Sequence, residues 1–445
     1  MSTEVRPVGV SCNIRCQYCY EQPMREEQAV HRYDRTAVLA AIEKIQGFWS
    51  LFGGEPLILN IRDIEELLAL GFKKNNQTGL QTNGNLITED HINLFIKYKT
   101  SVGISLDGPE HLNDIRWAGN LEATRKHTER SMWAIHRLCD IARTSTPHVR
   151  PSIIVTLHAG NLAEDRFPRF LQWLHELDDA GIQHLNLHLM EMDYKAHEWY
   201  IASDVVAARM IDIWNETFTN LRISNFTEIT KLLQGNDEVV CVWHPCDPWN
   251  TAAVHGVEND GAPSHCSRTN KDGINWLPAE GSGSSGQDTS FIGHPGTRMH
   301  ERQLALYVTP QELGGCKDCE YWLLCHGQCP GTGEHNDWRM RTTHCSTIKL
   351  LFREGEKRLK SAGVTPITLW PSRKTMEDLA YRAWTEQREI GLGELRRQSE
   401  QQAGASGGAS ACGTCHGDHT DTATMRAQGH GDNHGDRHGD HTDSN

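Results

Sequence analysis

Three cysteines near the start of the chain are spaced closely enough to bind one metal centre. Cys12, Cys16 and Cys19 are separated by three residues and then by two. Thiolates select zinc or iron–sulfur clusters, and a structural zinc site is closed by a fourth protein ligand. A cubane held by only three cysteines keeps one iron open, and that iron can bind a substrate or a cofactor. The spacing is therefore typical of a reactive cluster, with a zinc knuckle or free thiols as the simpler alternatives.

A second motif reads Gly53-Gly54-Glu55-Pro56 and follows a short β-rich run. Glycines let the backbone approach a ligand closely, and the Glu55 carboxylate can accept hydrogen bonds from an ammonium group. The cysteine loop, with Tyr18 before its last cysteine, and this GGEP motif together resemble the radical S-adenosylmethionine (SAM) superfamily.

That resemblance implies a cofactor and a set of site residues. It implies a [4Fe-4S] cluster whose open iron chelates SAM, and an electron from the cluster that splits SAM to a 5′-deoxyadenosyl radical. The residues that it assigns to cluster or cofactor are Cys12, Cys16, Cys19, Tyr18 beside the adenine, Gly53, Gly54, and Glu55 on the methionine amine.

A third motif, Ser105-Leu106-Asp107-Gly108-Pro109 followed by Arg116, resembles the LDGP segment of the subgroup that modifies peptides and proteins. The resemblance implies that Ser105 contacts the ribose or carboxylate of SAM. It also implies that Arg116 pairs with the carboxylate, a bidentate task that suits a guanidinium. A salt bridge at the protein surface is the alternative for Arg116.

Cysteines return in the second half of the chain, where eight thiols could supply four ligands to each of two cubanes. Their order, with Gly261 ahead of the third, resembles the SPASM domain, which carries two auxiliary [4Fe-4S] clusters. The resemblance assigns to the cluster nearer the active site Cys241, Cys246, Cys266 and Cys329, and to the outer cluster Cys316, Cys319, Cys325 and Cys345. A zinc ribbon would use four cysteines and leave four unexplained.

The elements that must position these motifs alternate between short β-rich runs and longer amphipathic helices. The predicted strands are 6–11, 49–52, 78–81, 102–106, 152–157 and 184–189, and the predicted helices are 35–46, 63–70, 89–96, 124–141, 166–180 and 205–217. Six βα units are too few for an eight-stranded barrel, so we expect an α/β fold with an open, partial (β/α)6 TIM-like barrel. The motifs follow successive strands, which is where such a barrel places its ligands.

Length and composition set the domain organisation. The 445 residues are enough for two domains and a tail. We expect a radical SAM core at 1–234, a SPASM domain at 235–350, a helical segment at 351–402 and a disordered tail at 403–445. A single helix is predicted over 373–402.

The tail repeats the sequence HGDHTD and is too polar to fold. Crowded histidines and carboxylates could capture metal, or the tail could only add solubility. Its Cys412-Gly413-Thr414-Cys415-His416 stretch also spells the attachment motif of c-type haem, for which no haem pocket is predicted.

Charge and hydropathy exclude two classes of partner. The net charge of −14, from 44 basic and 58 acidic residues, gives no electrostatic footprint for nucleic acid. No signal peptide and no apolar run of about 18 residues is present, so we expect no membrane span and a cytoplasmic protein. Fourteen cysteines in that compartment favour metal ligation over disulfides.

The leading hypothesis is a maturase that abstracts hydrogen from a ribosomally made peptide or a protein and forms a cross-link or other oxidised product. Its partners would be that substrate and an electron donor such as flavodoxin or ferredoxin. Thioether formation and formylglycine formation on sulfatases are the enzymatic alternatives. The sulfatase maturases place an acid after the third auxiliary cysteine, where this chain has Ser267. Asp247, after Cys246, is the candidate base.

An alternative of a different class is a non-catalytic iron–sulfur or metal-handling protein. Its clusters would be structural, and its histidine-rich tail would deliver metal. Cleavage of SAM by the reconstituted, reduced protein distinguishes this alternative from the enzyme.

Overall fold

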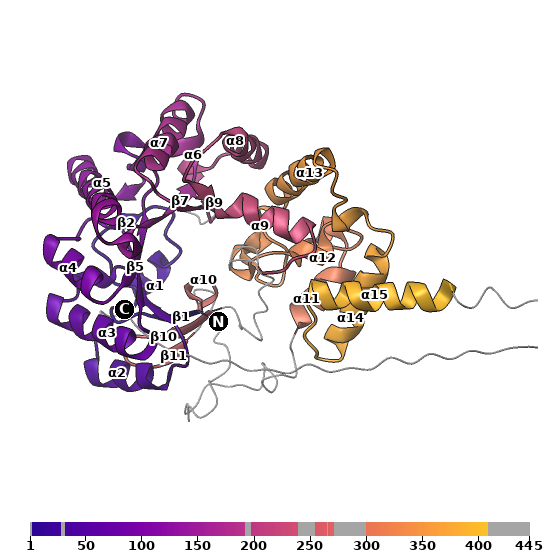
Figure 1. The fold of residues 1–445 in the computed structure, drawn as a ribbon, viewed down its shortest axis with the longest axis horizontal. Helices are drawn as coiled ribbons and strands as arrows, with labels where there is room; N and C mark the ends of the chain where they lie inside the picture. Colours follow the sequence, from indigo (N-terminus) through magenta and orange to yellow (C-terminus); the bar gives the residue numbers. More distant parts are fainter. Residues whose placement is uncertain are drawn as a thin grey trace, which may run out of the picture. The chain divides into compact units, whose positions relative to one another are not determined.

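A computed structural model describes residues 2–27, 32–191, 197–238, 254–264, 266–270 and 300–407. Within these residues, nine strands form one sheet in the order β11-β10-β1-β3-β4-β5-β7-β8-β9 (Figure 1). All neighbours are parallel except β10 and β11. The strands are β1 Ser2–Val5, β3 Trp49–Leu51, β4 Thr78–Thr82, β5 Thr100–Ser105, β7 Ser152–Leu157, β8 His184–Leu189, β9 Arg222–Ile223, β10 Val254–Val257 and β11 Pro263–Ser264.

The predicted α/β class is therefore confirmed, and five of the six predicted strands lie within two residues of their observed positions. The prediction of the first strand at residues 6–11 was wrong, because the strand is Ser2–Val5 and residues 6–11 form consecutive turns. Gly9 has a φ of 55°, and its amide donates to the Arg6 carbonyl at 2.9 Å. A left-handed glycine in a tight turn ends the strand early.

The sheet also extends beyond the expected core. β10 pairs with β1 through Ser2↔Val254 to Val5↔Val257, although it follows residue 234 by about twenty positions in the printed sequence. The described residues up to Glu400 belong to one compact unit, which includes the sheet and the described cysteines from Cys266 to Cys345.

Helices cover the sheet between the strands, and their ends follow the local chemistry. The helices are α1 Gln22–Glu27, α2 Arg35–Lys44, α3 Ile61–Asn75, α4 Glu89–Lys97, α5 Leu121–Thr144, α6 Ala159–Leu162, α7 Phe167–Asp179, α8 Ser203–Asn215 and α9 Ser224–Leu233. Asn60 begins α3 by accepting hydrogen bonds from Arg62 N and Asp63 N, which satisfies two free amides of the first turn. Asn76 ends α3 with a φ of 57°.

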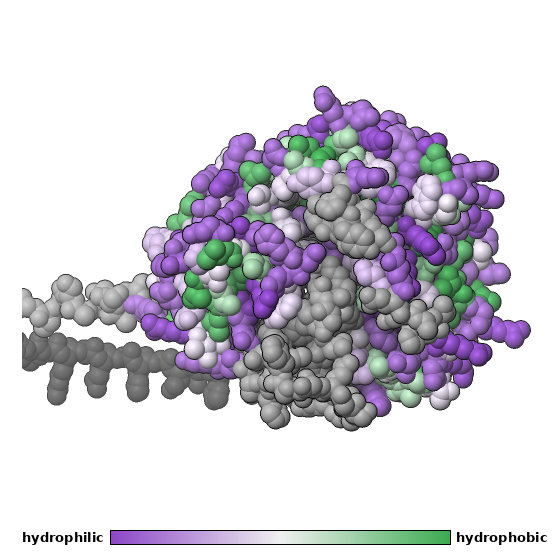
Figure 2. All heavy atoms as spheres, turned by 180° about the vertical axis from the view of Figure 1, so that it is seen from behind, coloured by the Kyte–Doolittle hydropathy of each residue, from purple (hydrophilic) through white to green (hydrophobic). Residues whose placement is uncertain are grey.

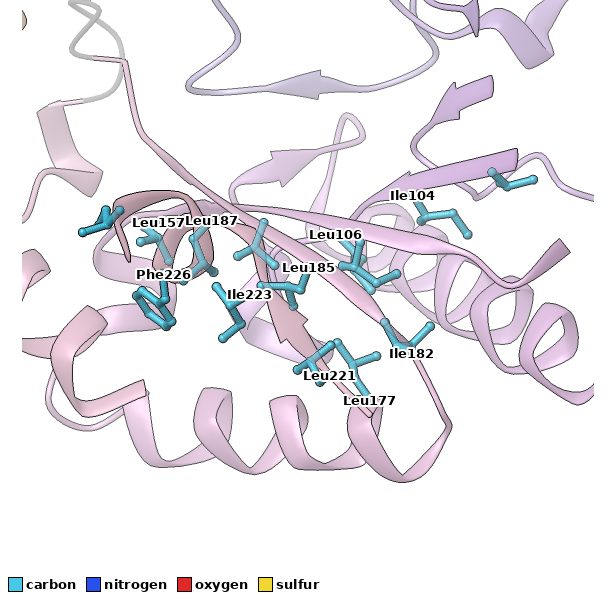
Figure 3. Packing of buried hydrophobic residues seen from close by; sticks show 14 of the residues in the cluster. Ile104, Leu106, Leu157, Leu177, Ile182, Leu185, Leu187, Leu221, Ile223 and Phe226 are labelled. Carbon is cyan, nitrogen blue, oxygen red and sulfur yellow. The ribbon is translucent and has the colours of Figure 1, made fainter. Parts of the chain in front are cut away.

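The core lies between the sheet and these helices. Leu157 and Leu187 from neighbouring strands pack beside Ile223 and Phe226 in Figure 3, and Leu106 lies farther along the same sheet face. Each of these side chains is less than one-tenth exposed. Burying a leucine or phenylalanine of this size contributes about 1.5–3 kcal/mol. This packing fixes the strand ends from which the motif loops leave the sheet.

Six further α-helices follow among the described residues. They are α10 Ser267–Asn270, α11 Glu301–Val308, α12 Trp322–Cys325, α13 Cys345–Ser361, α14 Arg373–Thr385 and α15 Leu392–Gly407. α13 packs on α8 and α9, and Thr347 Oγ1 donates to the Ser203 carbonyl at 2.9 Å. The single helix predicted over 373–402 is two helices, because Gln387 between them has a φ of 58°.

Polar side chains make up most of the coloured surface in Figure 2, and the apolar patches on that surface are small and separate. None of the described helices combines the length and the apolar composition needed to cross a lipid bilayer. Of the tail predicted to be disordered, residues 403–407 belong to α15, and residues 408–445 lie outside the described residues.

Candidate metal and cofactor site

Backbone hydrogen bonds from two distant segments fix the loop that carries Cys12, Cys16 and Cys19. Gly54 N donates to Gly9 O and Glu55 N donates to Ser11 O, each at 2.9 Å. On the other side, β2 (Arg15–Cys16) pairs antiparallel with β6 (Arg116–Trp117), and Gln17 N donates to Ile115 O at 3.0 Å. All three motifs predicted from the sequence thus converge at this loop.

The two glycines of the GGEP motif are required by this convergence. A Cβ on Gly54 would lie 2.2 Å from the Ser11 carbonyl oxygen. A Cβ on Gly53 would lie 2.5 Å from the Gly9 oxygen, and Gly53 also has a φ of +110°. The described close approach of these glycines is to another stretch of the protein's own backbone, and their contact with the cofactor remains a prediction.

The three thiols differ in exposure, since Cys16 is buried while Cys12 and Cys19 are half-buried. Burial raises the pKa of the Cys12 thiol to about 12, and it also raises the pKa values of Cys16 and Cys19. Two guanidinium groups, Arg25 and Arg116, act in the opposite direction. Thiols whose pKa is raised by burial are still deprotonated when iron binds them, so this donor set fits a metal cluster.

Glu55 is fully buried, and its carboxylate is held by neighbouring donors. Oε1 accepts from Leu57 N at 3.0 Å and from Thr82 Oγ1 at 2.7 Å, and Oε2 accepts from Asn83 N at 2.7 Å. Burial raises the pKa of Glu55, and these hydrogen bonds oppose the rise. A carboxylate can accept about four hydrogen bonds, so the described donors leave room for an ammonium group.

Tyr18 lies between two charged side chains, Arg116 and Asp107. Arg116 Nη1 donates to Tyr18 Oη at 2.6 Å, and Tyr18 Oη donates to Asp107 Oδ2 at 2.6 Å. Asp107 is fully buried and accepts a further bond from Thr156 N at 2.8 Å. The Nε2 atom of buried His158 lies 3.5 Å from Asp107 Oδ2.

This network keeps Asp107 ionised. Burial alone would raise its pKa, but the charge of Arg116 and the interactions with His158 and Tyr18 outweigh it and lower the pKa. One nitrogen of Arg116 is thus used to hold Tyr18, and its contact with a SAM carboxylate remains a prediction. Ser105, at the end of β5, is half-buried and accepts from Gln81 Nε2 at 2.8 Å, and its SAM contact also remains a prediction.

The second half of the unit brings four thiols around one cavity. Its lining includes the four residues assigned by resemblance to the outer cluster, Cys316, Cys319, Cys325 and Cys345. Burial raises the pKa values of Cys316, Cys325 and Cys345, as at the first loop. A thiol-lined cavity fits an iron–sulfur cluster by donor type. No group of histidines, cysteines and carboxylates among the described residues has the geometry of a single-ion site.

A buried arginine organises the loop between two of these cysteines. Arg302 is 2% exposed and donates to five carbonyl groups of the loop that links Cys325 to Cys345. The acceptors are the carbonyl oxygens of His326, Gly327, Gln328, Trp338 and Met340. The sequence carries no local signal for this role, because the partners lie 24 to 38 residues away.

Arg268 joins the second half of the unit to the sheet. Its Nε atom lies 3.0 Å from Glu191 Oε1, and its Nη2 atom lies 3.4 Å from Nδ1 of His188 at the end of β8. The guanidinium also lies 5.6 Å from the centre of the Tyr20 ring. Burial and the Arg268 charge lower the pKa of His188 to about 3, so this imidazole is neutral and can accept.

The near auxiliary set is only partly described. Cys266 and Cys329 are half-buried, whereas Cys241, Cys246 and the candidate base Asp247 lie outside the described residues. Both described cysteines interact electrostatically with Arg268.

Known proteins provide an independent comparison. The Radical SAM superfamily model matches residues 7–164. The chain is 23% identical over 390 residues to the cysteine-type anaerobic sulfatase-maturating enzyme of Clostridium perfringens (strain 13 / Type A), covering 81% of this chain and 97% of that relative. It is 35% identical over 127 residues to the serine-type anaerobic sulfatase-maturating enzyme of Klebsiella aerogenes, covering 25% of this chain and 30% of that relative.

The fold has a solved counterpart. Native anSMEcpe with bound AdoMet and Kp18Cys peptide superposes with a TM-score of 0.60 at 18% identity, over 81% of this chain and 98% of that chain. At this identity the likeness shows the fold alone. Residues 7–164 match the family model and contain the cysteine loop, the GGEP motif and the LDGP segment, so this part of the chain is a radical SAM domain, and the protein is an enzyme.

Proposed function

We propose that the protein is a peptide or protein maturase that abstracts a hydrogen atom from its substrate and yields a cross-link or another oxidised product. The observation that carries the proposal is the loop of Cys12, Cys16 and Cys19, fixed by backbone bonds next to the buried Glu55. A [4Fe-4S] cluster with SAM supplies the deoxyadenosyl radical that such a reaction needs.

The residues of the chain would bind and orient the reactants. The three thiolates hold iron, and Glu55 presents its remaining acceptor capacity to the methionine ammonium. Tyr18, held between Arg116 and Asp107, keeps its ring in a fixed position for the adenine. Such preorganised contacts lower the entropic cost of placing the reacting groups.

We also propose two auxiliary [4Fe-4S] clusters, which gives three in all. The outer one is supported by the four-thiol cavity around Cys316, Cys319, Cys325 and Cys345. The near one would use Cys266 and Cys329 with Cys241 and Cys246. Fully ligated clusters cannot bind substrate through iron, so their task would be electron transfer, with an external donor such as flavodoxin or ferredoxin supplying the first electron.

The substrate class follows from the relatives. Their names describe sulfatase maturation, and the similarity to one of them spans 81% of this chain, which favours a peptide or protein substrate. Formylglycine formation is a second candidate on the same ground, and thioether formation is a third. Ser267 stands after Cys266 and is buried, so a catalytic acid at that position is lacking.

The test uses anaerobically purified, full-length protein. We expect about twelve irons per chain and the release of 5′-deoxyadenosine from SAM under reductant. The combined change of Cys12, Cys16 and Cys19 to Ala should remove about a third of the iron and all cleavage. Cys139→Ala, at a buried cysteine of α5 outside both groups, is the matched control.

Substrate identity is tested separately by mass spectrometry. Peptides encoded beside the gene and sulfatase-derived peptides are incubated with the active enzyme. A loss of hydrogen mass confined to one peptide supports the maturase.

SAM cleavage that persists in the triple cysteine variant would overturn the cofactor assignment.

A further inference from the structure

Arg25 contacts the first cysteine loop although it belongs to none of the motifs. It lies on α1, six residues after Cys19, and its side chain is 17% exposed. Nη2 donates to Cys19 Sγ at 3.0 Å, and Nη1 donates to the Ile14 carbonyl at 3.1 Å. One guanidinium therefore binds a proposed iron ligand and the backbone between two such ligands.

Arg25 also lies 3.9 Å from the carboxylate of buried Glu21, and its two hydrogen bonds have different physical consequences. The bond to Ile14 O fixes the backbone of the loop, as a carbonyl contact does in any protein. The bond to Cys19 Sγ places a permanent positive charge and an N–H donor on a sulfur of the site, since arginine stays protonated throughout the working pH range. Hydrogen bonds to sulfur and nearby charge set the potentials of iron–sulfur clusters.

We propose that Arg25 is a positioning residue that closes the cysteine loop and raises the reduction potential of the cluster bound there. This inference rests on the proposed function, because it requires a cluster on Cys12, Cys16 and Cys19. Reduction adds an electron to the cluster, so a fixed cation in contact with a ligand sulfur stabilises the reduced form more than the oxidised form.

The chain offers a matched control in the same loop. Arg15 is exposed and sits on β2, one residue before Cys16, and no described contact joins it to a thiol. Arg15→Gln and Arg25→Gln remove the same charge by the same substitution. Solvent screens the charge of an exposed group, so only the Arg25 change should alter the cluster.

The experiment measures the potential of the cluster rather than turnover. Wild type, Arg15→Gln, Arg25→Gln, Arg25→Met and Arg25→Lys are reconstituted without oxygen, assayed for iron, and titrated with reductant while the reduced cluster is followed by electron paramagnetic resonance. Arg25→Gln should lower the ratio of reduced to oxidised cluster at a given potential about tenfold, which is a 59 mV shift to more negative values. Arg25→Lys should shift it less, and Arg15→Gln should not shift it.

Each outcome decides the proposal. A fully loaded Arg25→Gln cluster with the wild-type potential overturns it. If Arg25→Gln loads no iron, Arg25→Met, a second uncharged substitution, decides, and a loaded Arg25→Met protein with an unshifted potential overturns the proposed effect on potential. Failure of both variants to load, while Arg15→Gln loads normally, reduces the role to loop closure and also overturns that effect. Wild-type protein that binds no cluster contradicts the proposed function instead.

Discussion

Replacing Glu55 with alanine should destabilise the fold as well as weaken SAM binding. The carboxylate is fully buried and accepts hydrogen bonds from Leu57 N, Thr82 Oγ1 and Asn83 N. Alanine leaves these three donors without their acceptor. Each buried donor that loses its partner costs about 1–3 kcal/mol, so the loss is about 3 kcal/mol at the low end. That is a large fraction of the ordinary stability of a folded domain.

The assay must separate stability from binding. Chemical denaturation gives the free energy of unfolding of the apo-protein, and calorimetry with the reconstituted protein gives the affinity for SAM. Thr82→Val is the matched control, because it removes one donor to Glu55, together with the acceptor of Gly84 N, and leaves the charge in place. We expect it to cost about 2 kcal/mol, about 1 kcal/mol for each lost hydrogen bond, and to leave the SAM affinity unchanged.

Two results would refute this reasoning. If Glu55→Ala unfolds at the wild-type denaturant concentration, the carboxylate does not hold the GGEP segment and the end of β4 together. If it is destabilised as expected but binds SAM normally, the acceptor site left on Glu55 does not face the cofactor.

Three further changes test separate parts of the structure. Arg302→Lys should lower the thermal midpoint and release about four irons per chain, because lysine cannot reach five carbonyl oxygens at once; full iron content would contradict this. Burial alone would raise the pKa of Asp178, but three backbone amides outweigh it and lower that pKa. The ionised carboxylate therefore stabilises the fold fully above pH 3.8, and this stabilisation is lost as the pH falls further. In denaturation experiments at decreasing pH, Asp178→Asn should not show this loss of stability. Gly54→Ala should displace the cysteine loop and remove about four irons, whereas Gly393→Ala, whose added Cβ meets only the tip of a flexible side chain at 3.8 Å, should remove none.

Local patterns in the sequence were sufficient to predict most of the sheet. Thr78–Thr82, Ser152–Leu157 and His184–Leu189 are short runs of apolar and β-branched residues bounded by polar turns, so their type and position follow from nearest neighbours. The motif residues follow these strands, and parallel strands place such loops at one edge. The convergence of the motifs therefore follows from the order of strands and motifs along the chain.

The features that were missed depend on contacts across long stretches of chain. The pairing of β1 with β10 joins Ser2 to Val254, and no local pattern encodes that register. The early end of β1 depends on a left-handed glycine, Gly9, whose conformation is fixed by the GGEP segment above it. Arg25 carries no motif signature, since an arginine on a short helix is usually a solvated surface residue.

The GGEP and LDGP segments support the cysteine loop without supplying a ligand to the cluster. Its backbone is bonded to Gly54 and Glu55 on one side and to Ile115 and the β6 strand on the other. These bonds are made by main-chain atoms, so they form whether or not iron is bound, and they reduce the entropy that the loop would otherwise lose on binding a cluster. A substitution in the GGEP or LDGP segment can thus abolish cluster binding without touching a ligand. Loss of iron therefore identifies either a ligand or a residue that supports the loop, and loss of SAM affinity at full iron content identifies a residue that contacts the cofactor.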